Sequence, residues 1–325
     1  MKAVIVGPKF GNSDVRIISL EKPEPLDSEV LVRVTHAGLN PLDYNLINGN
    51  IVYNLKPVPH IPGSEIIGIV ESDSGNFRKG QRVLLYNRVF DGTCDRCRSH
   101  QEHLCINGGI WGVVTNGGYT EYVSVPEKNL LPIPDDLDNE TAVSIPIGAL
   151  TAYRALKRAG AEAGKSVLIY GASGNTGIFG IQLAKIMGLT VYAVSRKGWI
   201  GDYGAHRVFR NGEIPADLTA DIVVNSLGSQ FWEDSLKHLN TGGKLATFGV
   251  LTGREAAINI ASLYTKEISI IGSTGGDLKD LNELMRIFEA HKFRVPVAKK
   301  FTLEEISSAL EEYSRIRDGR IIIEV

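Results

Sequence analysis

Short apolar runs separated by glycine, proline and asparagine follow one another through residues 1–135. Runs of this length between turn residues are typical of β-strands. They lie at 2–6, 30–34, 66–71, 82–85 and 119–125. The first part of the chain is therefore predicted to be β-rich.

From about residue 139 the pattern changes, and strand-like runs alternate with segments that have helical spacing. The run 166–170 is typical of a buried strand, and 177–187 has the period of a helix. Further strands are expected at 190–195, 221–225, 243–248 and 267–271. This alternation predicts right-handed βαβ units around a buried parallel sheet. Two helices, near 278–290 and 303–317, and a strand at 320–325 complete the chain.

Composition narrows the class of protein. The chain has 325 residues, which at about 150 residues per domain predicts two domains. Lysine and arginine number 35 against 37 acidic residues, a balance that argues against a nucleic-acid binder relying on bulk charge. No apolar run approaches the roughly 18 residues needed to cross a bilayer, and Gly7-Pro8 interrupts the first run too early for a signal peptide. We expect a soluble cytoplasmic protein with no nucleic-acid or membrane partner.

The three cysteines are clustered at Cys94, Cys97 and Cys105. An odd, local set without a secretion signal argues against a disulfide framework. The cluster therefore requires a local chemical explanation.

A glycine-rich turn follows the strand predicted at 166–170 and opens the next helix. Residues 171–180 read GASGNTGIFG, which places Ala172-x-Gly174-x-x-Gly177 one step from the dinucleotide-binding pattern. Gly174 would let the backbone approach a pyrophosphate, and Gly177 would let the helix pack close to the strand. A tight turn without a ligand is the alternative. Because strand and helix flank the turn, we predict dinucleotide binding.

The end of the second strand bears on which dinucleotide binds. An NAD enzyme usually carries Asp or Glu here, whereas this chain has Ser195, Arg196 and Lys197. Two cations suit the 2′-phosphate of NADP(H). A solvated basic turn is the alternative. NADP(H) is predicted, with NAD as the less favoured cofactor.

Six further motifs make the chain similar to a known family. They are AGLNPLD at 37–43, PGSEIIG at 62–68, GQRV at 80–83, GGYTEY at 117–122, LTAYRAL at 150–156 and NSLG at 225–228. With the glycine-rich turn, they resemble the medium-chain dehydrogenase/reductases, which include zinc alcohol dehydrogenases and quinone oxidoreductases. The resemblance implies an α/β fold with a GroES-like β-barrel catalytic domain at 1–137 and 277–325. It implies a Rossmann domain, a doubly wound parallel sheet that binds the cofactor, at 138–276.

The resemblance also predicts that the catalytic zinc is absent. Alcohol dehydrogenases of the family bind it with a Cys, a His, and a Cys or Asp, and the corresponding positions here are Asn40, Ser64 and Ile147. None of these is an ordinary zinc ligand. The chain is therefore more similar to the zinc-independent quinone oxidoreductases and enone reductases, which share Gly38-x-Asn40-Pro41-x-Asp43.

A structural zinc lobe near 88–108 is implied by the same family. Its four ligands have the spacing Cys-x2-Cys-x2-Cys-x7-Cys, and the three cysteines fit the last three places, with Asp91 at the first. A carboxylate is a competent zinc ligand, so Asp91, Cys94, Cys97 and Cys105 would make a closed site. His100 and His103 are alternative fourth ligands. A vestigial lobe with three free thiols and no zinc is the other interpretation of the cluster.

The resemblance assigns the remaining candidates. Residues that could donate a hydrogen bond or a proton to the substrate are Asn40, Tyr44, Tyr53 and Ser64. The two tyrosines could equally be packing residues, and Asp43 a capping residue. Expected cofactor contacts are Asn40, Thr151, Ser173, Gly174, Asn175, Thr176, Gly177, Ser195, Arg196, Lys197, Asn225, Leu227, Phe248, Gly249, Ser273 and Thr274.

Three functions are compatible with these features. The first is an NADPH-dependent reductase of quinones or α,β-unsaturated carbonyls that needs no catalytic zinc. The second is an alcohol dehydrogenase or aldehyde reductase, and the third is a non-enzymatic NADPH-binding redox sensor. Members of the family that the chain resembles commonly join two Rossmann sheets across an edge strand, and the apolar strand at 267–271 is compatible with this arrangement. The resemblance therefore implies a homodimer or homotetramer.

Overall fold

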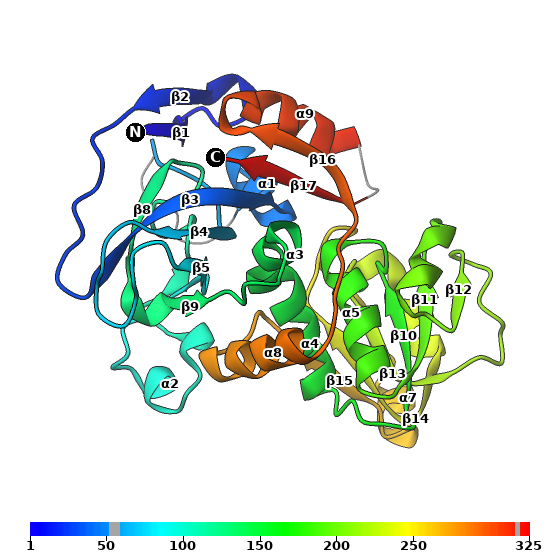
Figure 1. Cartoon of the computed structure of the whole chain (residues 1–325). Coiled ribbons are helices and arrows are strands. Elements are labelled where there is room, and N and C mark those ends of the chain that lie inside the picture. Colours follow the sequence, from blue (N-terminus) through cyan, green and yellow to red (C-terminus); the bar gives the residue numbers. More distant parts are fainter. Residues whose placement is uncertain (52–58, 316–318) are drawn as a thin grey trace. The chain divides into compact units, whose positions relative to one another are not determined.

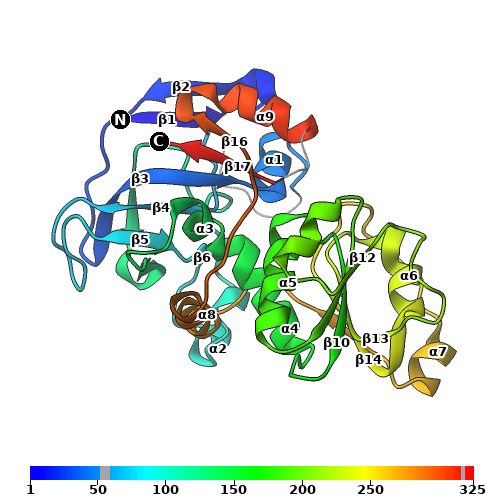
Figure 2. The ribbon, with the colours of Figure 1, turned by 45° about the vertical axis from the view of Figure 1, so that its right-hand side comes forward.

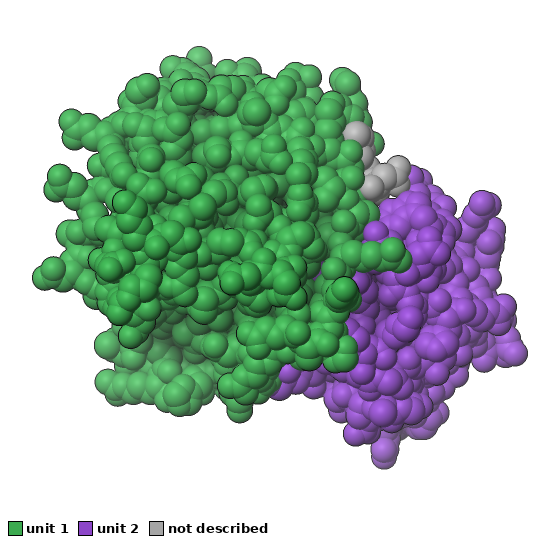
Figure 3. Space-filling model, viewed as in Figure 1, with its two compact units in different colours: residues 1–147, 277–325 green, residues 148–276 purple. Residues whose placement is uncertain are grey.

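The computed structural model describes residues 1–51, 59–315 and 319–325, which form two compact units (Figure 3). The first contains Met1–Ile147 and Asp277–Val325, and the second contains Gly148–Gly276. The sequence predicts a boundary after residue 137, whereas the structure places it after Ile147. The reason is that α3 (Asn139–Val143) packs against two strands of the first unit, β3 and β4.

The first unit contains a seven-stranded sheet in the order β16-β17-β3-β4-β5-β9, with β8 also paired to β3 (Figure 1). Its strands are β3 (Glu29–Leu39), β4 (Ile66–Val70), β5 (Arg82–Leu85), β8 (Tyr122–Pro126), β9 (Leu130–Pro132), β16 (Val297–Thr302) and β17 (Arg320–Glu324). Only the β16–β17 pair is parallel; the other pairs are antiparallel. Buried and half-buried side chains alternate along the first part of β3, because one face of this strand packs on the core.

Smaller elements complete the first unit. They are the paired strands β1 (Lys2–Val6) and β2 (Val15–Ser19), the paired strands β6 (Arg88–Val89) and β7 (Gly109–Ile110), and the helices α1 (Pro41–Ile47), α2 (Asp95–Arg98), α8 (Leu278–Ala290) and α9 (Ile306–Arg315). The core joins early and late parts of the chain, since Val32, Leu39 and Ile66 pack with Leu310 and Ile323. The last strand is therefore an integral part of this unit.

The second unit is built on a six-stranded sheet in the order β12-β11-β10-β13-β14-β15, with all neighbours parallel. Its strands are β10 (Ser166–Tyr170), β11 (Thr190–Val194), β12 (Arg207–Phe209), β13 (Ala220–Asn225), β14 (Leu239–Thr247) and β15 (Ser269–Gly272). Helices α4 (Leu150–Arg158) and α5 (Asn175–Ile186) cover one face, and α6 (Trp232–Lys237) and α7 (Ile260–Thr265) lie on the other (Figure 2). A short π-helix, Ile145–Ala149, precedes α4. This is the predicted doubly wound parallel sheet.

The sequence predicts most of these elements closely, and the differences have local causes. Strand β8 begins at Tyr122 rather than at 119, because the backbone N–H of Tyr119 donates to Pro62 and its carbonyl accepts from Val4. Strands β6, β7 and β12 are too short to give an apolar pattern. In the described part of the chain, no helix has the length and apolar character that crossing a membrane would require.

Candidate functional site

The glycine-rich turn of the second unit joins β10 to α5. Gly174 is the N-cap of α5, and its N–H donates to the carbonyl of Gly171 over 3.0 Å. A Cβ at Gly177 would lie 2.3 Å from that same carbonyl oxygen, so only glycine fits there. The turn therefore brings Ser173, Gly174, Asn175, Thr176 and Gly177 together at the start of a helix. Free backbone N–H groups in this first turn make it a suitable site for a phosphate.

The other predicted cofactor residues lie where neighbouring parallel strands end. Ser195, Arg196 and Lys197 follow β11, Phe248 and Gly249 follow β14, and Ser273 and Thr274 follow β15, while Asn225 ends β13 and Leu227 lies just after it. The carboxyl ends of adjacent parallel strands meet at one edge of the sheet, where ligands of doubly wound folds bind. Thr151 comes instead from the first turn of α4. A small cavity in this unit is lined by Ala152, Thr176, Gly177, Val224, Ser226 and Phe248.

Asn225 shapes the loop that follows β13. Its Oδ1 accepts from the N–H groups of Leu227 at 2.9 Å and Gly228 at 3.0 Å, and its Nδ2 donates to the Gly228 carbonyl. The side chain is fully buried. Asn225 therefore supports the loop at the cofactor edge through its amide group.

The basic turn after β11 carries no carboxylate. Arg196 is exposed, and the backbone N–H of Lys197 donates to the hydroxyl of Ser195 over 3.0 Å. This turn presents two cations and a hydroxyl beside the glycine-rich turn's strand, since β10 and β11 are neighbours. The donor set fits a phosphate monoester.

In the first unit, Asp43 ties together two segments that carry site candidates. Its Oδ2 accepts from the N–H of Asn40 at 3.0 Å, and its Oδ1 accepts from the N–H of Ser64 at 2.9 Å. Asn40 is the N-cap of α1 and Pro41 its first residue, so Asp43 closes a capping box. Asp43 therefore fixes Asn40 and Ser64 relative to each other.

Burial raises the pKa of Asp43 to about 6, although the N–H groups of Asn40 and Ser64 act in the opposite direction. The charge of Glu65 raises the pKa of Asp43 further. The pKa of the fully buried Tyr119 is also raised, first by its own burial and then by the charge of Asp43. A protonatable carboxyl group is therefore present in this cluster.

A pH effect on stability follows from Asp43. The folded chain binds this proton more tightly than the unfolded chain, so the contribution to stability is complete at acid pH and is lost as pH rises through about 6. Between pH 7 and pH 5, the free energy of unfolding should rise by about 1 kcal/mol more in the wild type than in Asp43→Asn. Urea titrations of both proteins at the two pH values test this. Equal changes would show that Asp43 does not titrate in this range.

Arg320 joins this cluster from the far end of the chain. Strand β17 pairs antiparallel with β3, with Ile321 opposite Leu39, so Arg320 lies next to Asn40. Its Nη1 donates to Oδ1 of Asn40 over 2.7 Å, and its Nη2 donates to Oε2 of Glu65. Arg320 is not among the site residues predicted from the sequence. The available signal was a lone arginine at the start of the closing Ile-rich strand.

The residues at the family's catalytic-zinc positions do not fit a zinc ion. The only side-chain oxygen of Asn40 already accepts from Arg320. Ile147 offers no ligand atom, and its backbone N–H donates to Oε1 of Glu65 over 2.9 Å. A guanidinium group within the cluster adds a fixed positive charge. The site is built for hydrogen bonding between side chains.

Of the two tyrosine candidates for proton donor, the structure describes only Tyr44. The ring of Tyr44 packs against that of Tyr313 in α9, with centroids 5.1 Å apart, which supports a packing role. Tyr53 lies outside the described residues.

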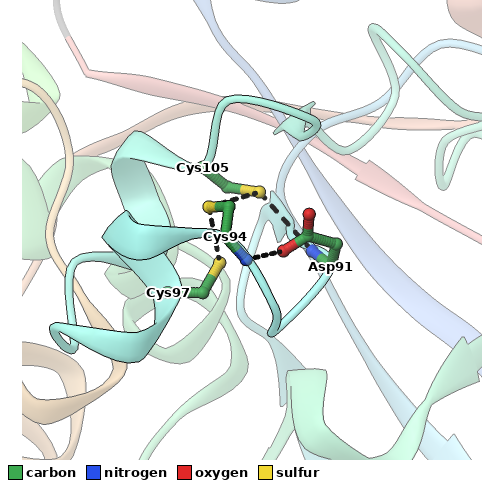
Figure 4. Close-up of side chains that lie close together, drawn as sticks. All are labelled: Asp91, Cys94, Cys97 and Cys105. Atoms are coloured by element: carbon green, nitrogen blue, oxygen red, sulfur yellow. Dashed lines mark hydrogen bonds between the residues drawn. The ribbon is translucent and has the colours of Figure 1, made fainter.

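The three cysteines and Asp91 come together in the lobe between β6 and β7 (Figure 4). Their candidate ligand atoms all lie within 4.8 Å of one another. Sγ of Cys94 is 3.6 Å from that of Cys97 and 3.8 Å from that of Cys105. Neither His100 nor His103 belongs to the group found among the described residues. Three thiol groups and one carboxylate fit a closed tetrahedral zinc site with a structural role.

Other residues hold Asp91 in place. Its Oδ1 accepts from the N–H groups of Thr93 at 2.8 Å and Cys94 at 3.1 Å, and its Oδ2 accepts from Asn107 over 2.6 Å. Such supporting bonds orient a carboxylate ligand. The lobe is anchored to the first unit because Glu102 accepts from the N–H of Leu278, the first residue of α8.

Two family models and several known proteins match this chain. Residues 26–135 match the alcohol dehydrogenase GroES-like domain, and residues 176–290 match the zinc-binding dehydrogenase family. A solved thermostable alcohol dehydrogenase from Pyrobaculum aerophilum, with cobalt and zinc bound, is 37% identical, with a TM-score of 0.92 and coverage of 100% of this chain and 99% of that one.

Two curated relatives carry reductase names. The acryloyl-coenzyme A reductase of Metallosphaera sedula is 30% identical, with 96% of each chain covered. The quinone oxidoreductase of Rattus norvegicus is 28% identical over 97% of this chain and 95% of its own length. The predicted GroES-like and Rossmann fold and the nicotinamide-dependent oxidoreductase activity are confirmed. The chain belongs to the medium-chain dehydrogenase/reductase family.

Proposed function

We propose that this chain transfers a hydride from NADPH to a quinone or an α,β-unsaturated carbonyl without a catalytic metal ion. The observation that carries the proposal is the hydrogen-bonded cluster of Asn40, Glu65 and Arg320. In this cluster Asn40 corresponds, by resemblance, to one of the zinc-ligand positions of the family's alcohol dehydrogenases. Two relatives support the acceptor class by name, a quinone oxidoreductase and a reductase of an acryloyl thioester, which is an unsaturated carbonyl compound.

Different groups of the chain would bind the cofactor and donate the proton. When bound, the reduced nicotinamide supplies the hydride. The N-terminus of α5 would bind the pyrophosphate, and Arg196 and Lys197 would bind the 2′-phosphate. Negative charge that develops on the acceptor oxygen requires a hydrogen-bond donor and then a proton. Ser64 is the donor we propose. Its buried hydroxyl has no hydrogen-bond partner among the described residues, and its N–H donates to Asp43, a carboxyl group whose raised pKa suits proton transfer near neutrality.

An alcohol dehydrogenase or aldehyde reductase is the second candidate. The similarity to the Pyrobaculum aerophilum alcohol dehydrogenase favours it. The test is NADPH oxidation, with NADH in parallel, against a quinone, an enone and an aldehyde. Turnover driven by the quinone or the enone supports the proposal, and turnover confined to the aldehyde supports the second candidate.

Cofactor preference gives a further prediction. Arg196→Ala should raise the KM for NADPH about 10-fold or more and leave the KM for NADH nearly unchanged, because only NADPH carries the 2′-phosphate. Lys237→Ala, which removes an exposed cation at the end of α6, is the matched control. Equal changes for the two cofactors would remove Arg196 from this role.

The exposed edge of the second unit suggests how subunits associate. Strand β15 is the last strand of the parallel sheet. Apolar side chains in the segment that precedes it are exposed: Val250 57%, Leu251 53%, Ile258 45%, Ile260 73% and Tyr264 69%. Such surfaces commonly mark protein interfaces. We propose a homodimer or homotetramer. Light scattering at micromolar concentration should give two or four times the chain mass of 35.4 kDa, and the mass of a monomer would contradict the proposal.

A further inference from the structure

Arg320, Asn40 and Glu65 form a closed, buried triangle of side chains. Arg320 donates to both other residues, and Nδ2 of Asn40 donates to Oε2 of Glu65 over 2.9 Å. Arg320 is 4% exposed, Asn40 2% and Glu65 0%. A Cβ at Gly38 would lie 2.0 Å from Nη2 of Arg320 and 2.5 Å from Oε2 of Glu65, so glycine makes room for the pair.

The triangle determines the orientation of the Asn40 amide group. Arginine offers only donors and an ionised glutamate only acceptors, so the amide oxygen must face Arg320 and the amide nitrogen must face Glu65. The same nitrogen also lies 3.4 Å from the Gly38 carbonyl. Turning the amide over would set donor against donor and acceptor against acceptor.

The guanidinium also balances the charge of the cluster. Glu65 and Asp43 are both buried carboxyl groups, and Arg320 is the cation that contacts the first of them. Replacing both Arg320 and Glu65 by apolar residues of similar volume would often be neutral or stabilising, because a buried ion pair loses much of its attraction to desolvation. The cost of keeping a charge here indicates a role beyond folding.

We propose that Arg320 is the positioning residue of this buried cluster: it fixes the Asn40 amide and neutralises Glu65, and so sets the geometry for reduction of the acceptor. This inference rests on the function proposed above. Arg320 acts through its hydrogen bonds to Asn40 and Glu65 and through its charge.

Arg320→Lys tests the role with the charge preserved. Lysine cannot reproduce the planar fork that holds Asn40 and Glu65 together. We expect kcat to fall about 10- to 100-fold, with the KM for NADPH close to wild type and a thermal midpoint that stays above the assay temperature because the charge beside Glu65 is kept. Arg33→Lys is the matched control, since Arg33 pairs with Glu71 on an exposed part of β3 and should leave all three quantities unchanged. A wild-type kcat in Arg320→Lys would overturn the proposal, as would a change confined to the KM for NADPH.

The double variant Arg320→Met/Glu65→Gln removes both charges and protects the test against a failure to fold. If orientation matters, this variant folds but keeps a low kcat. Full recovery of kcat would show that charge balance alone is needed and would overturn the positioning role.

Hydrogen exchange separates this inference from the proposed activity. The Asn40 side-chain amide, labelled with ¹⁵N-asparagine and identified by its loss in Asn40→Asp, should exchange at least 10-fold faster in Arg320→Lys than in wild type. Equal exchange overturns the positioning role. If the wild type reduces no acceptor but shows this difference, the proposed function fails while the orientation of Asn40 by Arg320 stands.

Discussion

Replacement of Cys97 by serine is expected to release the metal ion from the lobe and to lower the thermal midpoint by about 10 °C. Loss of one thiolate from a four-ligand structural site removes most of its affinity, and metal binding there contributes directly to folding. The rest of the first unit should also be destabilised, because Glu102 connects the lobe to the start of α8. Calorimetry and metal analysis of the purified variant measure both effects.

Turnover by the Cys97→Ser variant should stay within about twofold of wild type well below its unfolding temperature, because a closed structural site offers no position for a substrate. Ser99→Ala, in the same lobe but outside the ligand group, is the matched control and should keep both metal and stability. A collapse of kcat at an unchanged thermal midpoint would contradict a purely structural role.

Removal of the Glu65 side chain should be one of the most destabilising single changes in the first unit. Glu65→Ala leaves the Arg320 guanidinium buried without its anion and removes the acceptor for the Asn40 amide and for the N–H of Ile147. Leaving a buried charge uncompensated costs about 3–5 kcal/mol. Urea unfolding at pH 7 measures the difference in the free energy of unfolding.

An exposed ion pair provides the control for Glu65→Ala. Glu71 contacts Arg33 and Lys22 on the surface, and Glu71→Ala should cost about 1 kcal/mol or less. Adding Arg320→Met to Glu65→Ala should recover part of the lost stability, since the unpaired charge is then gone. Equal losses for Glu65→Ala and Glu71→Ala would mean that the buried triangle is not a stabilising unit.

Features that depend on neighbouring residues could be predicted from the sequence. Strand β10, the turn through Gly177 and helix α5 follow directly from apolar runs and glycine spacing. The grouping of Asp91 with the cysteines was implied by the resemblance to the family's zinc lobe, and the four residues lie within one short segment. Local patterns were sufficient in these places.

Features that depend on distant contacts could not be predicted in this way. Arg320 is 280 positions from Asn40, and the two meet only because β17 pairs with β3. The support that Asn225 gives to its own loop depends on the loop's conformation rather than on residue type. The observed domain boundary differs from the predicted one for the same reason, since helix α3 packs on strands that lie far earlier in the chain.

Activity measured against metal content tests most directly whether reduction proceeds without a metal ion. Zinc would be withdrawn stepwise by a chelator, well below the unfolding temperature, and NADPH oxidation by a quinone or enone would be followed per folded chain. We predict at most one zinc ion per chain, held by the lobe, and a rate that does not change as it is removed. A rate that falls to zero in proportion to the zinc lost, in chains that remain folded, and that returns on adding zinc would contradict a metal-free active site.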